Sequence, residues 1–98
     1  MAIEVRIPTI LRQYTGGAKS VEASGRSLGS LIDDLDAHHP GIKSRLVTED
    51  GKLHRFVNVY DNDEDVRFTG ALDTGLSDGD SVTILPAVAG GSGAAGNR

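Results

Sequence analysis

The fold is decided by a stretch near the C-terminus, Asp78-Gly79-Asp80-Ser81-Val82-Thr83-Ile84-Leu85-Pro86. Asp-Gly-Asp is a strong turn signal, and the alternation after it predicts a strand over residues 81–86 with Val82 and Ile84 facing inward. We expect this strand to lie beside a second alternating segment, residues 3–8, because the edge of that segment would otherwise leave an apolar face unburied.

The N-terminal segment predicts a β-hairpin. Residues 3–8 alternate between apolar and polar side chains, which is the period of a half-buried strand. Gly16-Gly17 is a turn signal, and residues 19–23 follow as a second strand.

One main helix is predicted after the hairpin. Ser27 can cap it, because a serine hydroxyl accepts a hydrogen bond from the first helical turn. Apolar residues then recur at i, i+3, i+4 and i+7, a stripe that must face a core: Leu28, Leu31, Ile32 and Leu35. Pro40 and Gly41 end the helix, and residues 42–46 form a short second helix or a turn.

The strongest strand pattern covers residues 53–60, with Val57 and Val59 on one face. Three shorter features follow in order: an acidic turn at 61–64, a short strand at 65–68 and a turn of helix at 73–76.

The order of these elements predicts an α+β protein with a β-grasp, or ubiquitin-like, fold. A mixed sheet of about five strands packs on one main helix within a domain of residues 1–86. Residues 87–91 form an arm that ends in Gly-Gly. Residues 92–98 are a flexible extension, as the dominance of Gly, Ala and Ser indicates.

Composition narrows the function classes. A chain of 98 residues forms one domain without room for a large catalytic cleft. A net charge of −4 and the absence of a Lys/Arg cluster argue against nucleic acid as a partner. The chain has no cysteine and no apolar run long enough to cross a membrane, so we expect a cytoplasmic protein without thiolate chemistry and without a membrane partner.

No metal site is expected. His38 and His39 are adjacent and cannot easily chelate one ion, and neither they nor His54 are accompanied by a cysteine or a correctly spaced third ligand. The acidic run at 61–65 lacks the glycine and terminal glutamate of an EF-hand, which favours a solvated turn.

The sequence also resembles a known family, the ubiquitin-like sulfur carriers, which include the small subunit of molybdopterin synthase and the thiamine sulfur carrier. The resemblance covers residues 3–91 and is most specific to the carrier that serves the O-phosphoserine-dependent cysteine synthase route. The segments that carry it are 7–12, 53–60, 62–68 and 80–91.

The resemblance implies a carrier that is a stoichiometric cosubstrate and not an enzyme. An adenylating enzyme of the ubiquitin-activating type would join AMP to the carboxylate of Gly91, and sulfide equivalents would displace AMP to leave a thiocarboxylate. That sulfur would attack an electrophile held by a cysteine synthase that uses pyridoxal phosphate (PLP), and a metalloprotease would trim the new cysteine from the tail. ATP, zinc and PLP would belong to these partners, and this chain would bind no cofactor.

The expected site residues form two groups. Gly91 carries the reactive carboxylate and Gly90 gives clearance, since glycine has no side chain to obstruct a narrow active site. A docking patch on the outer face of the sheet is expected from Phe56, Asn58, Tyr60, Leu85 and Val88.

The extension departs from the family pattern, because residues 92–98 convert the carboxylate of Gly91 into an amide. We therefore expect a precursor that a protease cuts after Gly91; the alternative is an extension without a role. Three other functions stay open: a small subunit of molybdopterin synthase, a ubiquitin-like modifier conjugated through Gly91, and a plain β-grasp interaction domain.

Overall fold

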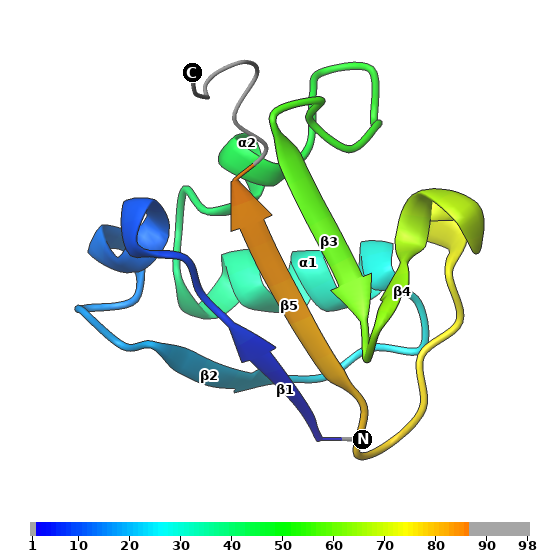
Figure 1. The fold of residues 1–98 in the computed structure, drawn as a ribbon. Coiled ribbons are helices and arrows are strands. Elements are labelled where there is room, and N and C mark those ends of the chain that lie inside the picture. The colour runs from blue at the N-terminus through cyan, green and yellow to red at the C-terminus, as the bar shows by residue number, and fades with distance from the viewer. Residues whose placement is uncertain (1, 87–98) are drawn as a thin grey trace, which may run out of the picture.

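The C-terminal strand β5 lies at the centre of the sheet in the computed structural model, which describes residues 2–86 (Figure 1). The five strands are ordered β2-β1-β5-β3-β4. Strand β5 runs parallel to β1 and antiparallel to β3, which confirms the predicted pairing of the last strand with the first. The strands comprise β1 (Ile3–Arg6), β2 (Ser20–Ala23), β3 (Val57–Asp61), β4 (Glu64–Asp65) and β5 (Ser81–Pro86).

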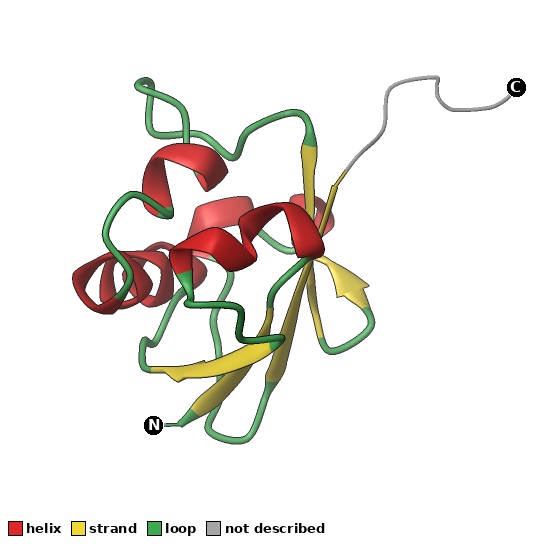
Figure 2. Ribbon diagram, turned by 90° about the vertical axis from the view of Figure 1, so that its left-hand side faces the viewer, coloured by secondary structure: helices red, strands yellow, loops and turns green. Residues whose placement is uncertain are grey.

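The main helix α1 (Leu28–His38) covers one face of the sheet (Figure 2). The hydroxyl of Ser27 accepts a hydrogen bond from the backbone N–H of Ser30, and the Ser30 side chain accepts one from the N–H of Ser27, so the predicted cap is a reciprocal capping box. The predicted apolar stripe is fully buried. After Pro40, Gly41 takes a positive φ of 98° and the chain turns into the short helix α2 (Lys43–Leu46).

The hydrophobic core lies between this helix and the inner face of the sheet. Alternate residues of the three central strands point into it, as the period of two predicts: Ile3, Val5, Val57, Val59, Val82 and Ile84. Burying each such side chain contributes about 1.5–3 kcal/mol to folding, so the alternation of β5 alone holds the strand in register. The β-grasp prediction is confirmed for the described residues.

Several boundaries differ from the sequence prediction. A 3₁₀ helix, η1 (Thr9–Tyr14), separates β1 from β2 and buries Leu11 in the core. Strand β3 begins at Val57 and not at residue 53. Residues 53–56 fold back toward α2, where the backbone N–H of His54 donates to the carbonyl of Leu46 at 2.8 Å.

The predicted strand at 65–68 and helical turn at 73–76 are also wrong in their bounds. Strand β4 ends at Asp65, because the Asp65 carboxylate accepts a hydrogen bond from the N–H of Arg67 at 2.9 Å and starts the 3₁₀ helix η2 (Val66–Phe68). A further 3₁₀ helix, η3, covers Ala71–Asp73 and precedes the predicted position of the turn.

A pair of carboxylates lies where β3 and β5 meet at the end of the sheet that holds the Asp78–Asp80 turn. Burial raises the pKa of Asp61 to about 6, and the hydrogen bond and charge of Asp80 and the charge of Glu64 add to the shift. The pKa of Asp80 is lowered, because its carboxylate accepts a hydrogen bond from the N–H of Ser77 at 3.0 Å. Asp61 Oδ1 is buried and finds no hydrogen-bond partner among residues 2–86.

The raised pKa makes stability depend on pH. Because Asp61 binds its proton more tightly in the folded state than in the unfolded state, its contribution to stability is lost as pH rises through the folded-state value of about 6. We expect the free energy of unfolding, measured in urea, to rise by on the order of 1 kcal/mol as the pH falls from about 7.5 to about 5. This figure allows for the weakening of the effect by solvent around the partly exposed carboxyl group. Asp61→Asn should flatten this rise, whereas Asp63→Asn in the exposed turn should keep it. A full pH slope in Asp61→Asn would show that another group is responsible.

Candidate functional site

The predicted reactive residues Gly90 and Gly91, and Val88 of the predicted docking patch, lie outside the described residues. So do the boundaries predicted for the arm at 87–91 and for the extension at 92–98. The structure describes the point from which that segment leaves the domain, the end of β5 at Pro86. The candidate site is therefore built from the surface around Pro86.

The outer face of β3 and β5 carries the rest of the predicted docking patch. Asn58 pairs with Leu85 across the two strands, and Tyr60 pairs with Thr83 one step further from Pro86. Phe56 immediately precedes β3, beside the end of β5. Asn58, Tyr60 and Leu85 therefore lie on one face of the β3–β5 pair, and Phe56 lies just outside the strand.

These residues do not all line one hollow. Phe56 and Leu85 line a common hollow of about 180 Å³ next to Pro86, but Asn58 and Tyr60 do not line it. Ile10 of η1, which is not among the predicted docking residues, lies in the wall of the same hollow. We refer to the apolar rim formed by Ile10, Phe56, Leu85 and Pro86 as the exit collar.

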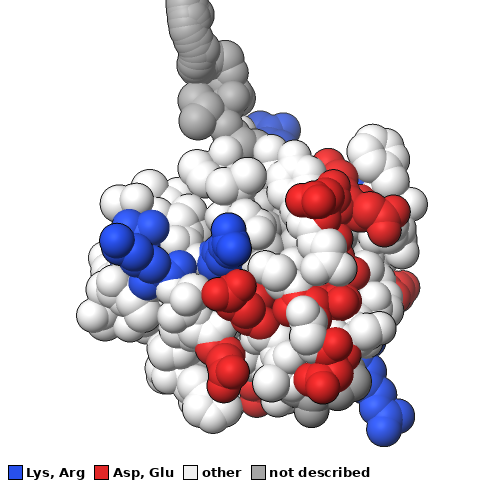
Figure 3. Space-filling view, turned by 60° about the horizontal axis from the view of Figure 1, so that its bottom comes forward, with Lys and Arg blue, Asp and Glu red and all other residues white. Residues whose placement is uncertain are grey.

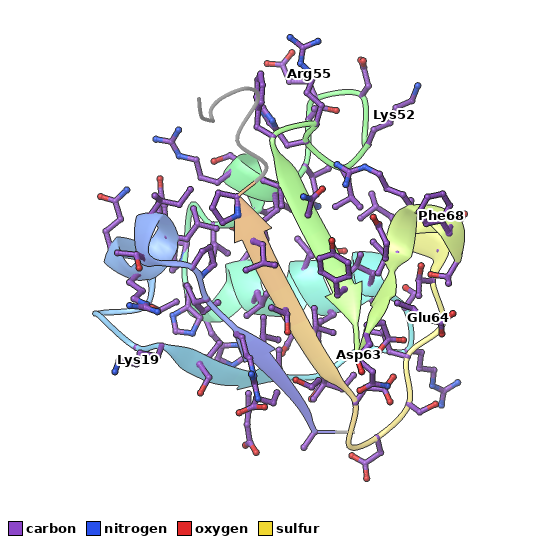
Figure 4. The ribbon with its side chains drawn as sticks, in the orientation of Figure 1. Lys19, Lys52, Arg55, Asp63, Glu64 and Phe68 are labelled. Carbon is purple, nitrogen blue, oxygen red and sulfur yellow. The ribbon has the colours of Figure 1, made fainter. Side chains whose placement is uncertain are left out.

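The exit collar gathers most of the exposed large apolar side chains. Within residues 2–86 there are four of these, and three belong to the collar: Ile10 (62% exposed), Phe56 (45%) and Leu85 (44%). The fourth, Phe68 (88% exposed), lies at the β4 edge of the molecule (Figure 4). Singly exposed apolar residues are common, but three around one hollow are not, and this makes the exit collar the candidate interaction surface.

Asn58 has a structural partner. The guanidinium of Arg67 donates to Asn58 Oδ1 at 2.8 Å and to the backbone carbonyls of Val57 at 2.6 Å and His54 at 3.1 Å. These three bonds tie η2 to the start of β3 and hold the segment that carries Phe56. No pattern in the sequence marks Arg67 for this role, since its partners lie 9 to 13 residues away.

Two arginines, Arg45 and Arg55, lie beside the collar. The guanidinium carbon of Arg55 lies 5.0 Å from the centroid of the Phe56 ring. The centroids of the His54 and Phe56 rings are 5.7 Å apart. Arg45 Nε donates to the hydroxyl of Tyr14 at 2.7 Å, and that hydrogen bond raises the pKa of the guanidinium. The collar therefore combines apolar side chains with fixed cations.

The described residues hold no other recognisable centre. In residues 2–86, no group of three or more His, Asp or Glu side chains is arranged to hold a metal ion. No helix in this part of the chain is both long enough and apolar enough to cross a membrane.

Comparison with known proteins gives the chain its family. The sequence model of the ThiS family matches residues 5–91, a range that includes the end of β5 and Gly90-Gly91. The chain belongs to the ThiS family. The resemblance to the ubiquitin-like sulfur carriers that the sequence predicts is thereby confirmed.

Individual relatives within the family cover almost the whole chain. The sulfur carrier protein CysO of Mycobacterium tuberculosis is 64% identical over 93 residues, which are 93% of this chain and all of the relative. Small archaeal modifier protein 3 of Haloferax volcanii is 34% identical over 94 residues and is also covered completely.

Solved structures of these relatives have the same fold. The crystal structure of M. tuberculosis CysO, at 64% identity, superposes with a TM-score of 0.85 and covers 88% of this chain and 99% of that one. The matching chain in the crystal structure of the Amycolatopsis orientalis BexX/CysO complex is 63% identical, has a TM-score of 0.86, and covers 92% of this chain and all of that one. This chain is thus a ThiS-family β-grasp protein, and its curated relatives are named as carriers and modifiers.

Proposed function

We propose that this protein carries sulfur for cysteine biosynthesis as a thiocarboxylate on Gly91. The observation that carries the proposal is the exit collar, which lies at Pro86, where the chain leaves the sheet. The match to the ThiS family continues beyond this point through Gly91. The 64% identity to the sulfur carrier CysO supports the cysteine branch over the molybdopterin branch.

The proposed reaction needs no catalytic side chain from this chain. A carboxylate oxygen of Gly91 attacks the α-phosphorus of ATP on the adenylating enzyme, and pyrophosphate leaves. A sulfide equivalent then adds to the acyl carbon and AMP leaves, which gives the thiocarboxylate. ATP, and the PLP and zinc of the later steps, are assigned to the partner enzymes.

The geometry suits such a carrier. Gly91 is the fifth residue after Pro86, and a fully extended chain of five residues spans about 17 Å. A partner can therefore bind the collar at its surface while the glycine enters an active site below. Because β5 is paired on both sides, the base of the arm stays fixed while its tip is handed from one active site to the next.

Three partners follow from this proposal: an adenylating enzyme of the ubiquitin-activating type, a PLP-dependent cysteine synthase and a metalloprotease that processes the tail. Each must accept the same Gly-Gly terminus. The exit collar offers a common apolar surface to all three, as expected for a carrier that exchanges partners through one interface.

A second function, conjugation to protein lysines through Gly91, is favoured by one observation. Small archaeal modifier protein 3 is 34% identical over nearly the whole chain. Carrier and modifier share the adenylation step and differ in the acceptor, which is sulfide for a carrier and a lysine amine for a modifier. Isopeptide-linked adducts in cells would favour the modifier.

The extension gives the first test of the proposed function. We expect the adenylating enzyme to catalyse ATP–pyrophosphate exchange with a chain that ends at Gly91 and not with the 98-residue chain, because residues 92–98 leave no free carboxylate on Gly91. Incubation with the processing metalloprotease should restore exchange to the longer chain. Equal exchange with both forms would contradict the precursor hypothesis, and no exchange with either would contradict adenylation itself.

The exit collar gives a second test. Phe56→Asp places a charge in the collar and should raise the KM of the adenylating enzyme for the carrier by about tenfold or more, since an unpaired charge must be buried against the partner. Phe68→Asp makes the same substitution at a more exposed position beyond β4 and should leave the KM unchanged. Thermal unfolding should show that both variants are folded. Equal kinetics for the two variants would remove the collar from the docking surface.

A further inference from the structure

The exit collar continues into a groove between η1 and the β1–β5 pair. The groove has a volume of about 630 Å³, and its apolar surface includes Ile10, Leu85 and Pro86. Three cationic side chains line the groove: Arg6 of β1, Arg12 of η1, and Lys19, which immediately precedes β2. Glu4 is the only carboxylate among the lining residues.

Two of the three cations of the groove, Arg12 and Lys19, have no ionic partner among residues 2–86, whereas Arg6 pairs with Glu4. Arg12 Nε donates to the backbone carbonyl of Ile7 at 3.2 Å, which fixes the guanidinium and leaves its terminal nitrogens free of this bond. Arg6 lies 3.7 Å from Glu4, and both side chains are largely exposed.

This local charge is opposite to that of the whole chain. The sequence holds 14 acidic and 10 basic residues, for a net charge of −4. Figure 3 shows basic side chains on the side of η1 and β2, and acidic side chains over the centre and the β4 side. In Figure 4, Lys19 lies at one edge of the molecule and Asp63 and Glu64 at the other. Because Glu4 pairs with Arg6, it is Arg12 and Lys19 that leave an excess of positive charge beside the apolar groove, and an anionic ligand in the groove can pair with that charge.

We propose that this groove binds an acidic, partly aliphatic segment of the enzymes that receive the arm. The proposal rests on the proposed function and adds the chemistry of the partner surface. Carboxylates of the segment pair with Arg6, Arg12 and Lys19, while its aliphatic side chains cover Ile10 and Leu85. The adjoining collar then places the start of the arm against the same partner.

A protein segment fits the groove better than a nucleic acid does. A nucleic acid requires a basic surface that follows several phosphates, whereas the cations here are confined to one groove on an acidic molecule. The apolar part of the lining also matches aliphatic side chains and has no counterpart in a phosphate backbone. Charge complementarity of this kind steers the approach of the partner and fixes its orientation.

The kinetic test uses the carrier that ends at Gly91 and the adenylating enzyme of the same organism. Lys19→Gln combined with Arg12→Gln should raise the KM for the carrier about tenfold at low salt and leave kcat unchanged, because binding is weakened and the chemistry is not. It should also reduce the dependence of KM on ionic strength. Arg26→Glu is the matched control: it changes an exposed cation outside the groove and should alter KM less than twofold.

A direct binding test uses the full chain labelled with ¹⁵N. A short peptide that alternates glutamate and leucine should shift the backbone amide signals of η1, β1 and the end of β5, whereas the same peptide with glutamine in place of glutamate should not. Inorganic phosphate and a single-stranded oligonucleotide serve as competing probes. The titration does not depend on adenylation, so it decides the proposal about the groove even if the proposed function fails.

Three results would overturn the proposal about the groove. The first is an unchanged KM in the double variant that thermal unfolding shows to be folded. The second is an equal rise of KM in Arg26→Glu, which would show that only the net charge matters. The third is tighter binding of the oligonucleotide or of phosphate than of the acidic peptide, which would assign the groove to phosphate groups.

Discussion

The pairing of β5 with β1 on one side and β3 on the other is the constraint on which the rest of the structure depends. A central strand cannot fray without breaking two ladders, and Val82 and Ile84 anchor it in the core. Pro86 is therefore held at one position relative to η1, α2 and the segment that carries Phe56. A chain that leaves a fixed point can be recognised by the surface around that point.

The two faces of the sheet divide the work of folding and binding. The inner face is covered by α1 and carries the apolar core, which leaves the outer face and its rim for partners. On the face shown in Figure 3, basic side chains gather toward η1 and carboxylates lie over the centre and toward β4. Pro86, the last described residue, therefore lies beside a cationic and apolar surface, although the protein as a whole is acidic.

Alternation and capping made much of this fold predictable from the sequence. The strands at both termini and helix α1 followed from local periods, because each buries one face against the same core. The place of β5 beside β1 followed from the need to cover the apolar face of β1, whereas its pairing with β3 on the other side is seen only in the structure. Local patterns also marked Phe56 and Leu85 as outward-facing residues.

The remaining features depend on contacts between distant residues. Ile10 is exposed beside the buried Leu11, and only the position of η1 against β5 makes it part of the collar. Asn58 faces outward as predicted, but its amide oxygen is bound by Arg67 from η2. The early end of β4 depends on one hydrogen bond from the N–H of Arg67 to the carboxylate of Asp65, which no period of two or of 3.6 indicates.

The central claim is that Gly91, presented by a fixed β-grasp body, becomes the sulfur-bearing terminus. Intact-mass spectrometry of the native protein, isolated without reductant from cells that synthesise cysteine, tests this most directly. We expect a chain that ends at Gly91, with a fraction in which one carboxylate oxygen is replaced by sulfur. A protein found only as the full chain ending at Arg98, with its pathway still active, would contradict it.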